Sequence, residues 1–167
     1  MILRKSKKED LDALMEVFSF ARSFMASTGN PYQWGHNQWP PRHVLEKDIE
    51  EGKGYVFVEG EEILGTFFLN VGEHVEPCYD YVEQGAWTKE GPYAVIHRIA
   101  SNGKAKGILK AAVDYAFTLV DQVRIDTHEE NKVMRSALAK LGFHSIGYIY
   151  VEQDTVRRIA FEKFKDR

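Results

Sequence analysis

Hydrophobic positions recur along the chain with two different periods, and the changes of period predict where helices and strands lie. Apolar residues at helical spacing predict helices over 11–25, 108–120 and 131–141. A fourth helix is predicted over 42–51, where it ends before Gly52. Short runs rich in β-branched and aromatic residues predict strands over 1–4, 55–59, 63–71, 93–100, 123–127, 143–152 and 155–163.

The order of these elements predicts the fold class. A strand, a helix and a strand in succession give a parallel pair with a right-handed crossover. The predicted hairpins on either side give antiparallel pairs. We therefore expect an α/β (α+β) fold with a mixed, mostly antiparallel central sheet and helices on both faces. Two stretches, 29–41 and 72–92, have no period and are predicted to be irregular.

Length, charge and cysteine content narrow the class of protein. The 167 residues suit a single domain over 1–167. A net charge of −3 argues against general nucleic-acid binding, and no segment approaches the ~20 apolar residues of a membrane span. The N-terminus shows no signal-peptide pattern. The lone Cys78 cannot form an intramolecular disulfide, so a cytoplasmic protein is expected.

The most informative segment is SNGKAKG, residues 101–107, between the predicted strand 93–100 and the helix that follows. The first amides of a helix lack intrahelical partners and favour an anion. Gly103 and Gly107 let the main chain approach a ligand closely. Lys104, Lys106 and Lys110 add positive charge, so the segment predicts a phosphate site. Neither the Walker pattern nor the GxGxxG dinucleotide pattern is present.

This segment, together with IDTHEENKVMRSALAKLGF over 125–143, resembles the GCN5-related N-acetyltransferase (GNAT) family. In that family a Gln/Arg-x-x-Gly-x-Gly/Ala pattern binds acetyl-coenzyme A, and residues 102–107 match it with Asn102 and Ala105 at two of its defined positions. The later strand, the Asn131 at a helix start and the Leu-Gly-Phe ending also match. The resemblance covers nearly the whole chain except 72–92, and it implies the GNAT fold.

The resemblance implies that acetyl-CoA is the cosubstrate and that no metal is required. Main-chain amides from Lys104 to Ile108 would hold the pyrophosphate. Strand residues would pair with the pantetheine arm as though it were another strand. The cofactor-binding residues expected in this way are Arg98, Ile99, Ala100, Asn102, Gly103, Lys104, Ala105, Lys106, Gly107, Ile108 and Asn131.

The function implied is transfer of an acetyl group to a primary amine of a small molecule or peptide, directly within a ternary complex. Many family members use a Tyr as general acid where this chain has Leu138, and the sequence does not select Tyr148 or Tyr150 in its place. Two alternatives stay open: a catalytically silent CoA-binding regulatory module, and transfer of a longer acyl chain. A homodimer is one expectation, because many relatives pair.

Three residues are candidates for the base that takes a proton from the amine: His97, Asp126 and His128. Polar residues in strands often serve structure instead. His97 as a hydrogen-bonded sheet residue, Asp126 as a helix cap and His128 in a surface loop are therefore the alternatives. Cys78 is not favoured as a nucleophile, because the neighbouring Glu76 and Asp80 would raise its pKa.

The loop 29–41 is expected to cover the acceptor site. Trp34 and Trp39 are predicted to form a wall for an amine, with His128 nearby. The alternative is that the two indoles only anchor the loop by burial. Trp87 and the segment 79–81 are further candidates for this pocket.

Overall fold

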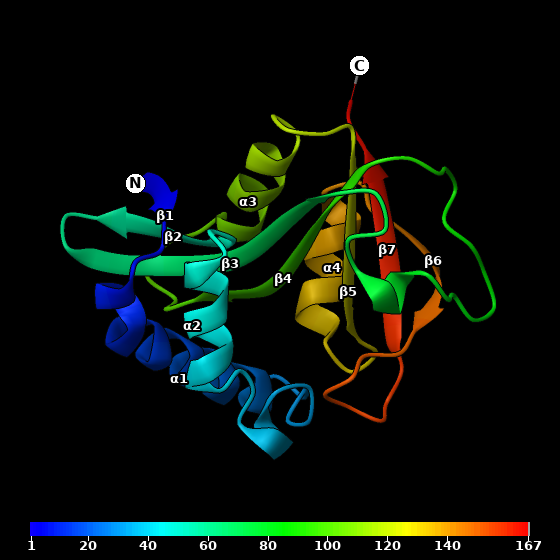
Figure 1. The fold of residues 1–167 in the computed structure, drawn as a ribbon. Coiled ribbons are helices and arrows are strands. Elements are labelled where there is room, and N and C mark those ends of the chain that lie inside the picture. The colour runs from blue at the N-terminus through cyan, green and yellow to red at the C-terminus, as the bar shows by residue number, and fades with distance from the viewer. Residues whose placement is uncertain (167) are drawn as a thin grey trace.

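A seven-stranded sheet forms the centre of the molecule (Figure 1). The structure is a computed structural model that describes residues 1–166, apart from the side chain of His36. Arg167, the last residue of the predicted domain, lies outside the described residues. The strand order is β1-β2-β3-β4-β5-β7-β6. The strands are β1 Ile2–Lys5, β2 Gly54–Glu59, β3 Glu62–Gly72, β4 Tyr93–Ser101, β5 Gln122–His128, β6 His144–Ile149 and β7 Arg158–Phe164.

In the described part of the chain, four α-helices cover the two faces of the sheet: α1 Leu11–Ser27, α2 Arg42–Glu50, α3 Ile108–Ala116 and α4 Lys132–Lys140. Helices α1 and α2 lie on one face, and α3 and α4 lie on the other (Figure 1). Alternate strand residues serve the two cores: Ala94 and Ile96 of β4 pack toward α3, whereas Val95 points to the opposite face. Among the strands of residues 1–166 only β4 and β5 are parallel, so the predicted mixed, mostly antiparallel sheet is confirmed.

Three predicted elements end or begin three or more residues inside their predicted boundaries. The helix predicted over 108–120 ends at Ala116, because Thr118 Oγ1 donates to the Tyr115 carbonyl (2.6 Å) and competes with the helical bonds. The strand predicted over 143–152 ends at Ile149, and the one predicted over 155–163 begins at Arg158. Asp154 accounts for this loop: its carboxylate accepts from the Val156 amide and from Arg158.

The segment 73–92, which lies within the stretch predicted to be irregular, folds back onto the sheet beside β4 and β5. It contains the short 3-10 helix η3, Pro77–Tyr79. The Arg124 guanidinium of β5 lies 4.3 Å from the Trp87 ring and 4.1 Å from the Tyr93 ring, and it donates to the Lys89 carbonyl. This stacking fixes the segment against the face of the sheet on which the polar side chains described below gather. No helix within residues 1–166 is both long and apolar enough to cross a membrane.

Candidate active site

The sheet opens between its two parallel strands. Strands β4 and β5 are paired at Ala94–Val123 and Val95–Arg124, and no further pair between them is recorded among the described residues. Farther along β4 the register with β3 shifts between Thr66 and Phe68, which marks a β-bulge. The main chain of β4 beyond Val95 is therefore free to meet a ligand on the side that faces β5.

Arg98 stabilises this bulge rather than facing the opening. Its φ of 49° is in the left-handed region that non-glycine residues rarely adopt. Its guanidinium donates to both oxygens of Asp48 (2.7 and 2.8 Å) and lies over the Phe68 ring. Burial raises the pKa of Asp48 above its ordinary value, although Arg98 opposes this. The sequence placed Arg98 among the cofactor-binding residues, but the structure directs its charge to Asp48 of α2.

We expect Arg98→Met to destabilise the fold by ~2 kcal/mol at neutral pH, because it leaves a buried carboxylate without its partner. With the pKa of Asp48 raised further in the folded state, folded protein keeps a proton that unfolded protein has lost. Stability should therefore fall as pH rises above the ordinary Asp pKa of 3.8. Urea denaturation at about pH 5 and about pH 7.5 measures this. Arg42→Met, which removes an exposed ion pair with Asp12, is the control and should cost under ~1 kcal/mol with little pH dependence. Equal losses for both variants would contradict the prediction.

A cleft of ≈ 290 Å³ lies beside the open strand and is mostly apolar. It brings together five of the predicted cofactor-binding residues: Ile99, Ala100, Gly103, Ile108 and Asn131. The other residues that line the cleft lie on or next to α1, β4, α3 and α4. They are Phe20, Ala21, Phe24, Met25, Thr28, Ser101, Leu109, Val133, Met134 and Ala137. An elongated, largely apolar ligand with one polar end fits such a cleft.

The polar end of the cleft is the loop between β4 and α3. The Gly103 amide donates to Ser101 Oγ and the Lys104 amide to Asn102 Oδ1, both at 3.0 Å. For the amides from Ala105 to Ile108, no acceptor is recorded within residues 1–166. Gly107 immediately precedes α3 with φ 79°, a conformation that turns successive amides to one side. The result is a row of open donors at a helix start, which is what a phosphate requires.

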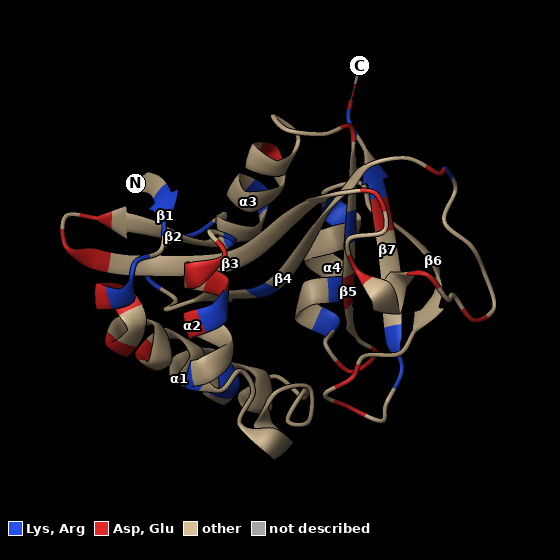
Figure 2. Ribbon diagram, viewed as in Figure 1, with Lys and Arg blue, Asp and Glu red and all other residues tan. Residues whose placement is uncertain are grey.

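Charge around this loop is positive but partly compensated. Figure 2 shows basic positions in blue along α3 and α4. Lys106 and Lys110 are exposed, and Lys110 pairs with Asp114 one helical turn later. Lys104 Nζ contacts Glu62 Oε1 of β3 at 2.9 Å, and Asn102 donates to the same oxygen. Because these contacts are exposed, an arriving phosphate can displace Glu62 at little cost.

A cluster of titratable side chains lies where β4 and β5 separate. His97 Nε2 is 2.7 Å from Glu76 Oε2, and His97 Nδ1 is 3.6 Å from Asp126 Oδ2. Tyr79 donates its hydroxyl hydrogen to that same Asp126 oxygen (2.7 Å). Two of the three base candidates of the sequence analysis, His97 and Asp126, are thus neighbours on adjacent strands.

Glu76 is a functional candidate that the sequence analysis missed, whereas Tyr79, which was expected only as part of the acceptor pocket, contacts Asp126. Although burial raises the pKa of Glu76, the hydrogen bond and charge of His97 lower it below its ordinary value, which keeps the carboxylate ionised. Burial and the adjacent Asp126 raise the pKa of Tyr79 well above its ordinary value, so the phenol stays protonated. The only available signal was the acidic, aromatic composition of the segment, which does not indicate where it folds.

The predicted acceptor residues are more buried than expected. Trp34 lies in the core beneath α1, edge-on to Phe18, and Trp39 is half-buried beside it. His128 is the last residue of β5 and is buried, so its placement in a surface loop was wrong. Burial, then the nearby Arg158, lower the pKa of His128 below its ordinary value.

Tyr148 and Tyr150, which the sequence analysis considered as general acids because Leu138 occupies the usual Tyr position, lie on or just beyond β6. Leu138 is fully buried in the core. Strand β6 is three strand spacings, roughly 14 Å, from β4. Tyr150 donates to Glu83, and Arg157 lies over the Tyr148 ring. Tyr79 is the tyrosine that the described structure places in contact with the His97 and Asp126 cluster.

Comparison with known proteins identifies the family. The family model described as Acetyltransferase (GNAT) domain matches residues 1–144. A GNAT-family acetyltransferase from Streptococcus agalactiae 2603 is 26% identical, with a TM-score of 0.85 over 99% of this chain and 96% of that one. No curated protein matched the sequence. The chain therefore belongs to the GNAT family of acetyltransferases.

More distant structures share the fold. A GNAT-family acetyltransferase from Listeria monocytogenes 4b F2365 is 17% identical, with a TM-score of 0.68 over 98% of this chain and 94% of that one. A structure titled ribosomal-protein-alanine N-acetyltransferase from Brucella melitensis is 12% identical, with a TM-score of 0.62 over 98% and 99%. At these identities the likeness is one of fold, and it does not name the acceptor of this chain.

Proposed function

We propose that this chain is an acetyl-CoA-dependent N-acetyltransferase that acetylates a primary amine of a small molecule or peptide by direct transfer in a ternary complex. The observation that carries the proposal is the position of His97. It lies between the carboxylates of Glu76 and Asp126, on the same strand as Ile99 and Ala100 of the cleft. His97, which can accept a proton from an amine, thus lies next to a cleft suited to a thioester that carries phosphate groups.

The residues present fit acetyl-CoA. The open amides from Ala105 to Ile108 would hold the pyrophosphate, and the unpaired edge of β4 near Ile99 would hold the pantetheine amides. The apolar walls of the cleft suit the methylene groups of the pantetheine. When bound, acetyl-CoA supplies an acetyl group activated as a thioester.

His97 is the base in this proposal. With Nε2–H donated to Glu76, the lone pair of Nδ1 is left to accept a proton from the amine. Asp126 then stabilises the imidazolium that forms, and the Tyr79 hydroxyl keeps its carboxylate in place. A main-chain N–H of the bulge near Ile99 would stabilise charge on the thioester oxygen.

Direct transfer is supported by the state of the lone thiol. Burial, then the nearby Glu76, raise the pKa of Cys78 far above its ordinary value, so it is not a thiolate at neutral pH. A covalent acetyl-cysteine step therefore has no activated nucleophile. The same unpaired thiol supports a cytoplasmic location. We propose that residues 1–167 act as one N-acetyltransferase domain.

The proposal predicts that free thiol is released from acetyl-CoA only when a suitable primary amine is present. A panel of polyamines, amino acids, amino sugars and short peptides, read with a thiol reagent, tests this. Mass spectrometry of the product should show one added acetyl group on the amine. Tight binding of acetyl-CoA without turnover on any amine would instead favour the regulatory module. Faster turnover with a longer acyl-CoA than with acetyl-CoA would favour the other alternative.

A further inference from the structure

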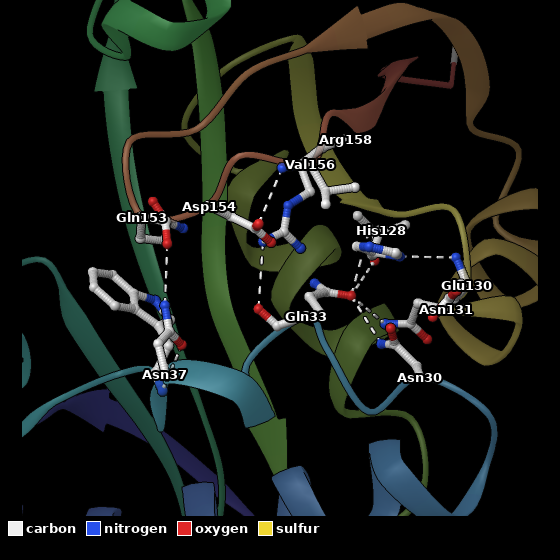
Figure 3. Close-up of polar contacts among 12 residues, drawn as sticks. Asn30, Gln33, Asn37, His128, Glu130, Asn131, Gln153, Asp154, Val156 and Arg158 are labelled. Atoms are coloured by element: carbon white, nitrogen blue, oxygen red, sulfur yellow. Dashed lines mark hydrogen bonds and ion pairs between the residues drawn. The ribbon is translucent and has the colours of Figure 1, made fainter.

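One buried oxygen gathers donors from several parts of the chain. Gln33 Oε1 accepts from Asn30 Nδ2 (3.0 Å), Thr127 Oγ1 (3.2 Å), the His128 amide (3.3 Å) and Asn131 Nδ2 (3.1 Å), as Figure 3 shows in part. A carbonyl oxygen has two lone pairs, so the four converging donors share them. Gln33 is 8% exposed, so water does not readily replace any of these donors.

The four donors come from three separate elements. Asn30 belongs to the loop after α1, Thr127 and His128 to the end of β5, and Asn131 to the start of α4. Gln33 itself lies in the loop that leads to Trp34. Its amide oxygen therefore fastens the loop after α1 to the strand that carries Asp126 and to a helix that lines the cleft.

Asn131 transmits this contact to the cleft. Its Oδ1 accepts from the Met134 amide (3.0 Å) and caps α4, while its Nδ2 donates to Gln33. Both atoms of one amide group are thus used, so the side chain has a single orientation. Asn131 and Met134 both line the cleft, whereas Gln33 does not.

The groups around Gln33 Oε1 require an acceptor oxygen at that position. All four groups that meet Oε1 are donors. The buried Arg158 donates to the Gln33 main-chain oxygen (3.4 Å) and to Asp154 (2.9 Å), so positive charge is close by. A carboxylate in place of the Gln33 amide would keep every donor satisfied.

We propose that Gln33 is a positioning residue for the acetyltransferase reaction: through Asn131 it holds the start of α4 where that helix forms the wall of the acetyl-CoA cleft. The inference rests on the proposed function. Gln33 acts without touching cofactor or acceptor, and its oxygen, rather than its volume, is what the cleft needs.

The test compares Gln33→Met, which keeps the length of the side chain but removes the oxygen, with Gln33→Glu, which keeps the oxygen. Titration calorimetry with acetyl-CoA should show ~10-fold weaker binding for Gln33→Met and a change under ~3-fold for Gln33→Glu. The KM for acetyl-CoA should follow the same order, while kcat at saturating acetyl-CoA changes by less than ~3-fold. Gln84→Met, an exposed glutamine beside α4 and β6, is the matched control and should bind like the wild type.

Thr127→Val removes one of the four donors while keeping side-chain shape, and should weaken acetyl-CoA binding ~3-fold. If thermal unfolding shows that Gln33→Met does not fold, the affinity of Thr127→Val for acetyl-CoA tests the inference instead. Equal affinities for Gln33→Met and Gln33→Glu, or wild-type affinity in Thr127→Val where Gln33→Met is unfolded, would overturn the inference. The wild-type arm reports separately on the proposed function, because absence of acetyl-CoA binding there would overturn both.

Discussion

His97→Gln is expected to lower kcat by ~10³-fold, within the range that general base catalysis contributes. The glutamine side chain can still donate to Glu76, so the local structure is kept, but it offers no lone pair basic enough to accept a proton from an amine. Asp126→Asn keeps the shape of the carboxylate and removes the charge that stabilises the imidazolium, so we expect a loss of ~10²-fold. Steady-state thiol release with the best amine of the panel measures both.

His144→Gln is the matched control for this prediction, since His144 is an exposed residue of β6 and takes no part in the cluster. Its turnover should equal that of the wild type. Thermal unfolding of all three variants checks that each is folded. Near-wild-type rates in both His97→Gln and Asp126→Asn would remove the base assignment, and Glu76 would then be the next group to test.

The proposed cofactor loop could be predicted from the sequence because its signal is local. The glycines, the lysines and the start of α3 are contiguous, and the amides that line up there follow from where a helix begins. The strand-helix-strand order likewise predicted that His97 and Asp126 lie on neighbouring strands, and in the structure His97 Nδ1 is 3.6 Å from Asp126 Oδ2. Patterns of this kind depend on residues that are close in the chain.

The other features of the site depend on contacts between residues far apart in the chain, which the periodicity of the sequence does not predict. Glu76 reaches His97 because Arg124 stacks between Trp87 and Tyr93 and fixes the irregular segment. Arg98 looked like a phosphate ligand from its position, but Asp48, 50 residues earlier, takes its charge. Burial of ionisable groups, which decides their pKa and hence their use, follows from such packing.

Gly107→Val is expected to weaken acetyl-CoA binding by ~10²-fold. The φ of 79° at Gly107 is unfavourable for any side chain and most of all for a β-branched one, so the loop must rearrange. Because the open amides from Ala105 to Ile108 flank this residue, rearrangement turns them away from the pyrophosphate. Calorimetric titration with acetyl-CoA measures the loss, and Lys104→Glu combined with Lys106→Glu should weaken binding in the same direction by reversing the charge at the loop.

Gly60→Val separates the loss of binding from the general cost of strain. Gly60 has φ 61° in the turn between β2 and β3, and a Cβ there, as at Gly107, would meet nothing within 4 Å. Both variants should therefore lose similar stability, of the order of 1–2 kcal/mol, in urea denaturation. Only Gly107→Val should lose affinity for acetyl-CoA, since only that glycine borders the open amides. If both variants kept wild-type affinity, the diphosphate would have to be bound elsewhere, and the interpretation of the loop between β4 and α3 as its cradle would be wrong.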